Sequence, residues 1–259
     1  RLSADLWGVA RYLATAIQHG SIASPLGIAC RCAGSLGFAM LRLDFDIHPA
    51  ALIDRRPEYL APMISGLDGI WITAAEPYVS FDENGLFEAS SMVGGAVFQR
   101  VKPNFGNQQL AEQGSGIVFH AGQNCGLFAK FPKGLGQVVS CALRFTSASQ
   151  NAKTLLTFNP TGQDNYVFLS QSGRELLLKD QQTTQECVVQ HDAPSADIGV
   201  LLAITDERLS LRVVDGAFIQ SKYGMDIDLR QSMEVFLGCR KNRGGLQKTL
   251  GEFVLKDFI

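Results

Sequence analysis

Four basic residues gather near the end of the sequence, around a Gly-Gly pair. They are Arg240, Lys241, Arg243 and Lys248. A guanidinium presents a planar fork of N–H donors that suits sulfate, carboxylate or phosphate, and a lysine adds a compact positive charge. The cluster therefore predicts an anion-binding loop. The alternative interpretation is a solvated loop whose charges serve only solubility.

Two tyrosines and three aspartates border predicted turns. Tyr166 and Tyr223 could stack on a sugar ring, although a strand-end tyrosine also packs with only its hydroxyl in water. Asp164, Asp192 and Asp197 could supply the hard oxygen ligands that calcium prefers, without the dense alternation of an EF-hand loop. We therefore expect no required cofactor and name calcium as the candidate metal.

Nucleophile and cofactor motifs are not found in the sequence. It contains no G-x-S-x-G, no H-E-x-x-H and no phosphate-binding or dinucleotide-binding glycine fingerprint. The four histidines are scattered, at His19, His48, His120 and His191. The adjacent pairs Asp82-Glu83 and Asp206-Glu207 lie in predicted turns, where neighbouring side chains of an extended backbone point apart. We expect a protein that is not an enzyme.

The composition indicates a folded chain with a full core. Hydrophobic residues make up 46% of the 259 residues and charged residues 19%. The formal net charge of -2 argues against nucleic acid as the main partner, since phosphate binding needs clustered excess Lys and Arg. No apolar run reaches the roughly 18 residues of a membrane span.

The six cysteines do not form a zinc-site pattern. They are Cys30, Cys32, Cys125, Cys141, Cys187 and Cys239. Cys141 and Cys187 lie inside apolar strand-like runs, where a reduced cysteine behaves as a small hydrophobe. We expect buried free thiols, with a disulfide framework as the alternative.

The first 66 residues differ from the rest of the chain. Residues 3–19 carry an apolar stripe at helical spacing, which predicts a helix that packs on its own domain or docks on another subunit. Residues 41–47 alternate as a half-buried strand does. Because the sequence begins with Arg1, we expect a processed product or a piece of a longer chain. We place a boundary near Gly66, with residues 1–66 serving docking or oligomerisation and residues 67–259 forming the main domain.

From Asp68 onward, short apolar runs alternate with turn residues. The runs are Gly69–Thr73, Tyr78–Phe81, Gly95–Val101, Gly116–His120, Gly126–Phe131, Gln137–Phe145, Lys153–Phe158, Asn165–Leu169, Arg174–Lys179, Glu186–Gln190, Gly199–Thr205, Leu209–Val214, Met233–Gly238 and Leu250–Ile259. A turn is predicted at residues 159–162 and a loop from Gly216 to Leu229. Many short strands without helices between them predict an antiparallel sandwich or barrel.

The last third carries a family resemblance. Its pieces LLAITD, LSLRVVDG, VFLG and LGEFVLKDFI follow in an order that resembles the concanavalin A-like lectin and glucanase superfamily, especially its laminin-G-like members. The resemblance covers residues 66–259 in plan and is clearest over residues 140–259. It implies a mainly β fold, an antiparallel two-sheet jelly-roll sandwich, with a short N-terminal helical segment.

The resemblance also implies a function. Many catalytic members carry two glutamates and an aspartate on one strand, and the pattern E-x-D-x-x-E does not occur in this sequence. We therefore expect a non-catalytic recognition domain for a glycan or acidic polysaccharide at a cell or particle surface. Some laminin-G-like domains hold acidic glycans through basic loops, which the Arg240 cluster resembles.

Two further functional hypotheses remain open. One is a structural subunit of an oligomer or larger assembly, such as a phage-like spike, fibre or decoration protein. The other is a glycan-cleaving enzyme, which the missing acidic triplet disfavours. An enzyme of that kind would need two carboxyl groups roughly 5–10 Å apart in a cleft.

Overall fold

The computed structural model describes residues 61–259, except residues 63, 67, 84, 102–110, 113–115, 122–124, 148–150, 183–185, 192–196, 206–207, 215, 217, 222–226 and 242–248. Ala61–Ile259 forms one unit. The predicted helix at residues 3–19, the predicted strand at 41–47 and the role proposed for residues 1–66 fall outside the described residues. The boundary near Gly66 stays a prediction. Among the described residues, no helix is long and apolar enough to cross a bilayer.

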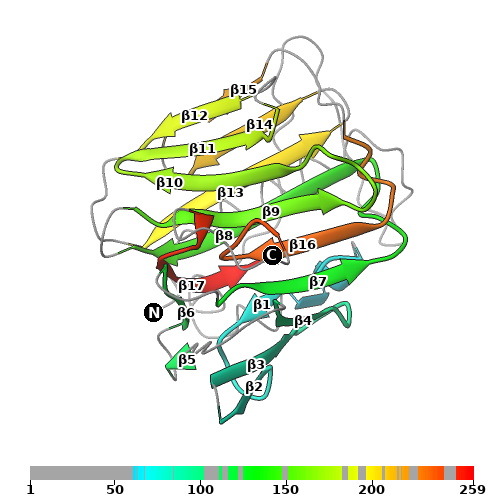
Figure 1. Cartoon of the computed structure of the whole chain (residues 1–259), viewed down its shortest axis with the longest axis vertical. Helices are drawn as coiled ribbons and strands as arrows, with labels where there is room; N and C mark the ends of the chain where they lie inside the picture. The colour runs from blue at the N-terminus through cyan, green and yellow to red at the C-terminus, as the bar shows by residue number, and fades with distance from the viewer. Residues whose placement is uncertain are drawn as a thin grey trace, which may run out of the picture. The chain divides into compact units, whose positions relative to one another are not determined.

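The strands form two antiparallel sheets (Figure 1). The eight-stranded sheet runs in the order β15 (Phe218–Gln220), β14 (Leu209–Val213), β13 (Ile198–Thr205), β8 (Val138–Thr146), β17 (Phe253–Phe258), β6 (Gly116–Phe119) and β5 (Ala111–Glu112), and β1 (Ile72–Thr73) also pairs with β17. The nine-stranded sheet runs in the order β12 (Glu186–Gln190), β11 (Glu175–Asp180), β10 (Val167–Ser172), β9 (Lys153–Pro160), β16 (Met233–Leu237), β7 (Leu127–Phe131), β4 (Val97–Arg100), β3 (Gly85–Ser90) and β2 (Val79–Asp82).

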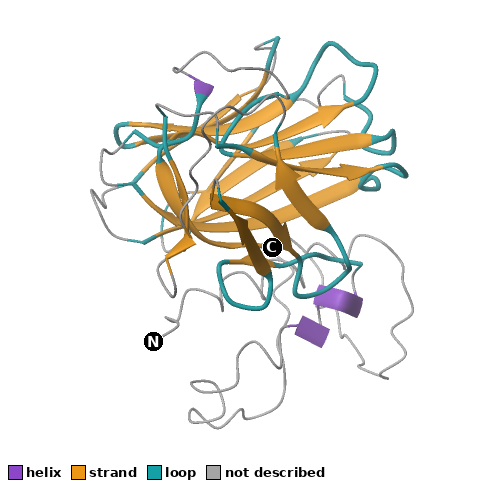
Figure 2. Cartoon of the chain, turned by 60° about the horizontal axis from the view of Figure 1, so that its bottom comes forward, coloured by secondary structure: helices purple, strands orange, loops and turns teal. Residues whose placement is uncertain are grey.

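The sheets pack face to face, and the chain crosses between them several times. It passes from β8 to β9, back from β12 to β13, across again from β15 to β16, and returns from β16 to β17. Strands dominate the described residues, with only short helical turns beside them (Figure 2). The fold is an antiparallel two-sheet sandwich of the jelly-roll type, which confirms the predicted fold class.

Alternating side chains explain why the sheets face one another. Along β13, the core receives Ile198, Val200, Leu202 and Ile204, and the intervening residues point away. Phe253 of β17 stacks on Phe119 of β6 with ring centres 4.6 Å apart. Each such side chain stabilises the fold by about 1.5–3 kcal/mol when it leaves water.

Four details differ from the sequence predictions, and one of them is strand β5 (Ala111–Glu112), which was not predicted. The loop predicted from Gly216 to Leu229 is wrong in part, because β15 pairs with β14 there. The turn predicted at residues 159–162 begins later, since β9 continues through Pro160, which pairs with Met233. Strand β3 was not predicted, because Gly85–Ser90 lacks β-branched residues.

Four cysteines lie among the described residues, and all are buried. Cys141, Cys187 and Cys239 are free thiols, as predicted. Burial raises the pKa of Cys141 to about 12 and that of Cys187 to about 11. These thiols therefore stay protonated near neutral pH and act as core residues. Cys30 and Cys32 lie outside the described residues.

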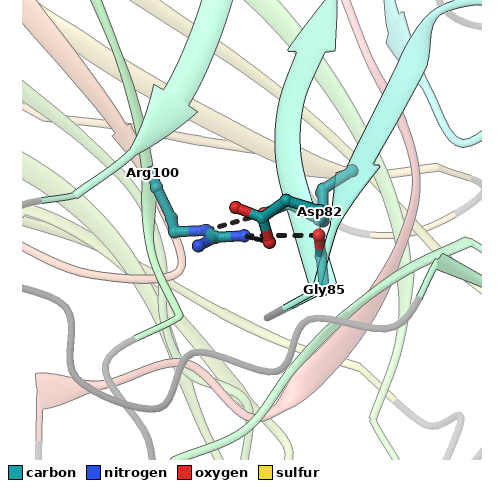
Figure 3. A network of polar contacts seen from close by, with 4 residues as sticks. Asp82, Gly85 and Arg100 are labelled. Atoms are coloured by element: carbon teal, nitrogen blue, oxygen red, sulfur yellow. Dashed lines mark hydrogen bonds and ion pairs between the residues drawn. The ribbon is translucent and has the colours of Figure 1, made fainter.

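The hairpin of β2 and β3 is held by one arginine of β4 (Figure 3). Arg100 donates from Nη2 to Oδ1 of Asp82 over 2.6 Å and to the carbonyl of Gly85 over 3.2 Å. Its Nε donates to the carbonyl of Leu86 over 3.0 Å. The carboxylate of Asp82 thus fixes the edge of the sheet, a structural role for one member of the Asp82-Glu83 pair.

Candidate functional site

A row of side chains crosses the outer face of the nine-stranded sheet, the face turned away from the eight-stranded sheet. Pairing between neighbouring strands aligns Phe168 of β10 with Thr157 of β9, then with Phe236 of β16 and Phe128 of β7. Directly paired residues share one face of an antiparallel sheet. Their sequence neighbours, such as Leu169, face the core instead. We call the three phenylalanines, Phe168, Phe236 and Phe128, the aromatic row.

Phe168 and Phe236 of the aromatic row are covered although they lie on the outer face. Phe236 is 0% exposed and Phe168 2%. After β16 the backbone turns at Gly238, and Cys239 and Leu250 pack against Phe236. The carbonyl of Cys239 accepts a hydrogen bond from Oγ1 of Thr157 over 3.1 Å. The described residues after β16 therefore fold back onto the sheet and bring Arg240 with them.

Three basic side chains lie against rings on this face. The Cζ of Arg240 is 3.8 Å from the ring centre of Phe168, and its Nε donates to Oγ1 of Thr154 over 3.2 Å. The Nζ of Lys179 is 5.8 Å from the same ring centre, and the Nζ of Lys241 is 4.8 Å from that of Tyr166. We call Lys179, Arg240 and Lys241 the basic patch. Each contact contributes about 0.5–1 kcal/mol at an exposed site and more where water is excluded.

The structure brings some of the predicted site residues together. Arg240, Lys241 and Tyr166 lie in one place, whereas Arg243, Lys248 and Tyr223 fall outside the described residues. Tyr166 is only 7% exposed, and its ring lies beneath Lys241 and beside Phe168, with a centre distance of 6.0 Å. A sugar could stack on this ring only after Lys241 moved. As arranged, the ring holds a cation.

Lys179 and Phe168 were not predicted as site residues. Lys179 is the one basic residue of β11, and the pairing of β10 with β11 places it opposite Phe168. A hairpin register read from a two-residue turn at residues 173–174 would have aligned the two. That alignment is the sequence signal through which Lys179 could have been found.

Asn165 positions Tyr166 beside the basic patch. Its Oδ1 accepts hydrogen bonds from the backbone N–H groups of Tyr166 and Gln181 over 3.1 Å each. Its Nδ2 donates to Oδ2 of Asp180 over 3.0 Å. The side chains of Asn165 and Asp180 are both buried. Asn165, next to the candidate calcium ligand Asp164, therefore joins the ends of β10 and β11.

The candidate calcium ligands do not form a cluster among the described residues. Asp164 is exposed, and Oδ2 of Asp197 lies 4.0 Å from Nη1 of Arg144, a cation that would oppose a bound Ca²⁺. Asp192 falls outside the described residues. Within the part of the chain that the structure describes, no group of three or more His, Cys, Asp or Glu could hold a metal ion. Calcium binding stays a prediction.

Comparisons with known proteins find a similarity to solved structures only. No protein family matches the sequence, and no curated protein matches it. Mouse laminin alpha1 domains LG4-5 are 13% identical with a TM-score of 0.37, covering 48% of this chain and 35% of that chain. A heptameric SAP-like pentraxin from Limulus polyphemus is 13% identical with a TM-score of 0.38, covering 51% of this chain and 67% of that chain.

A third solved structure concerns cell entry of botulinum neurotoxin type C through interaction with two ganglioside molecules. It is 8% identical with a TM-score of 0.45, covering 73% of this chain and 46% of that chain. This chain thus spans about a third of the laminin alpha1 structure and less than half of the neurotoxin structure. These neighbours are concanavalin A-like jelly rolls, the fold that the sequence resemblance predicted.

Proposed function

We propose that the sandwich is a non-catalytic recognition domain that binds carbohydrate at a cell or particle surface, through the outer face of its nine-stranded sheet. The observation that carries this proposal is the basic patch. Arg240 and Lys241 emerge directly after a strand of the rigid sheet, and their side chains are held against rings. Binding groups supported in this way lose little freedom when a ligand arrives.

The chemistry of the described residues favours binding over catalysis. Burial raises the pKa of Cys141 and Cys187, so neither supplies a thiolate nucleophile near neutral pH. Burial also raises the pKa of Cys125 and Cys239. Asp82 is engaged by Arg100. The acidic triplet of the catalytic relatives is missing from the sequence as well.

A glycan-array screen of the purified chain tests the proposal, with calcium in one arm and a chelator in the other. We expect binding to a defined set of glycans, weakened in an Arg240→Gln variant and unchanged in an Arg212→Gln variant. Arg212 is the matched control because it is an exposed arginine on β14, in the other sheet. A folded wild-type chain that bound no glycan would overturn the proposal.

A structural subunit is the second candidate, favoured by the edge strand β15. All three of its residues are exposed, and they include Phe218 at 42% and Ile219 at 38%. An edge strand with apolar side chains is a ready site for pairing with another chain. Light scattering of the purified chain tests this candidate. A stable oligomer that a Phe218→Lys variant dissociates would support it, and a concentration-independent monomer would contradict it.

A further inference from the structure

We infer that the basic patch binds its ligand through an anionic group, a sulfate or carboxylate borne on a saccharide, and that Lys179 is its third contact. This inference rests on the proposed function and specifies the ligand chemistry at the same site. Lys179 lies more than 60 residues before Arg240 in the sequence and reaches the patch only through the pairing of β10 with β11.

The basic patch has no counter-charge within the part of the chain that the structure describes. Among the described residues, no carboxylate lies within 4.0 Å of Lys179, Arg240 or Lys241. Glu186 pairs with Lys179 in the β11–β12 ladder but makes no ion pair with it. Asp180, the neighbour of Lys179, is buried and bonded to Asn165. In the described part of the chain, no acid therefore neutralises the positive charges of the patch.

Three other basic residues on the sheets do have an acidic partner. Lys130 lies 3.6 Å from Glu234 on the same outer face, and Arg144 lies 2.8 Å from Asp257 on the other sheet. Arg100 is paired with Asp82. Each of these cations has an acid within ion-pair distance. The basic patch differs from them because its cations lie on rings, which stabilise a positive charge without neutralising it.

The rings beneath the basic patch are not available to a sugar. Phe168 is 2% exposed beneath Arg240, and Tyr166 is 7% exposed beneath Lys241. A ligand approaching this face therefore meets N–H donors before it meets a π surface. The chemistry that such donors recognise is a carboxylate or sulfate, through charge-assisted hydrogen bonds.

Two contacts already orient the side chain of Arg240. Stacking on Phe168 fixes its plane, and the bond from Nε to Thr154 fixes its rotation. Its two Nη groups have no acceptor among the described residues. These groups form the edge of the guanidinium that suits a two-oxygen acceptor. Because the side chain is ordered before binding, the entropic cost of recognition is reduced.

The test compares two charged polysaccharides with an uncharged one. Binding of the full chain to dextran sulfate, polygalacturonate and dextran is measured by interferometry over a range of salt concentrations. We expect binding to one or both charged polymers and none to neutral dextran, with affinity falling as salt rises. Lys179→Gln and Arg240→Gln should each weaken binding about tenfold, the value of one charge-assisted hydrogen bond.

Four controls keep the result interpretable. Arg212→Gln removes the same charge from the other sheet and should change affinity less than twofold. Arg240→Lys keeps the charge and loses the planar fork, so partial loss is expected. The thermal midpoint of each variant establishes that it is folded. Vesicles of phosphatidylserine in phosphatidylcholine separate a saccharide from a lipid as the source of the anionic group.

Several outcomes would overturn the inference. Equal binding to dextran and dextran sulfate would exclude charge as the basis of recognition. Folded patch variants that bind charged polymer like the wild type would move the site elsewhere, and binding to anionic vesicles alone would exclude a saccharide. The chain could also bind neutral glycans on the array, with Lys179→Gln and Arg240→Gln binding them as the wild type does. That result would preserve the proposed function and overturn this inference. A chain that bound no glycan of any kind would remove both.

Discussion

Arg144 lies in a strand of the eight-stranded sheet, and Arg240 lies against the outer face of the nine-stranded sheet. The two side chains contact different kinds of partner. Nη2 of Arg144, on β8, lies 2.8 Å from Oδ2 of Asp257 on β17. Asp257 also accepts a hydrogen bond from Nε1 of Trp71 over 3.1 Å, so the carboxylate joins β17 to the residue before β1. Arg240 instead lies on the ring of Phe168 and bonds a neutral hydroxyl.

The difference separates a structural arginine from one that we propose binds a ligand. The charge of Arg144 is neutralised inside the fold, with side-chain exposures of 20% for Arg144 and 8% for Asp257. Removing the guanidinium of Arg144 would leave the buried carboxylate of Asp257 without its cation. The charge of Arg240 is oriented by its ring but has no acid beside it among the described residues. Removing it should disturb the fold less and binding more.

Replacing Arg144 by Met should have the largest effect on stability. The carboxylate of Asp257 would remain buried without its cation, and breaking such a pair costs about 3 kcal/mol. Urea denaturation measures the free energy of unfolding. The double variant Arg144→Met with Asp257→Asn should recover part of the loss. If the single variant is as stable as the wild type, Arg144 does not have the structural role that separates it from Arg240.

Replacing Arg240 by Met should have a smaller effect on stability, about 1 kcal/mol. The loss comprises one cation–π contact and one hydrogen bond to a hydroxyl. Binding of dextran sulfate should nevertheless fall about tenfold. The same denaturation experiment and a binding isotherm measure the two effects. A loss of stability equal to that of Arg144→Met would contradict the distinction.

Alkaline pH should weaken the core that Arg144 borders. Burial raises the pKa of Cys141, also on β8, from 9.0 to about 12. The folded state thus holds this proton more tightly than the unfolded state does. The contribution to stability is complete below pH 9 and decreases as the pH rises towards 12. The expected loss is about 1 kcal/mol between pH 9 and pH 10.

Urea denaturation of the wild type and of Cys141→Ala at several pH values measures this dependence. The variant should lose stability less steeply over the same range. Identical slopes in the two proteins would show that Cys141 does not contribute.

Replacing Asp82 by Asn should have the smallest effect. Asp82 and Arg100 are also an ion pair, at 2.6 Å, but their side chains are 36% and 16% exposed. A partly solvated pair contributes about 0.5 kcal/mol and is screened by salt. Denaturation with and without 1 M NaCl measures the pair. A loss as large as that of Arg144→Met would mean that exposure does not decide what these pairs contribute.

The sequence by itself predicted most of the strands and the fold class. Strict alternation in Leu209, Leu211 and Val213 places one face in a core, because successive side chains of a strand point in opposite directions. β15 was missed because all of its residues are exposed, so it has no alternation to detect. β3 follows an Asn-Gly pair, a hairpin signal that could have revealed it.

The candidate site was only partly predictable. Arg240 and Lys241 stood out because they are close together in the sequence, and local charge density can be read from the sequence alone. Their contact with Phe168 and Tyr166, and the presence of Lys179, depend on which strands pair and in which register. Register is decided by contacts between residues far apart in the chain. Only the tertiary structure could therefore place three cations on the rings of one sheet face.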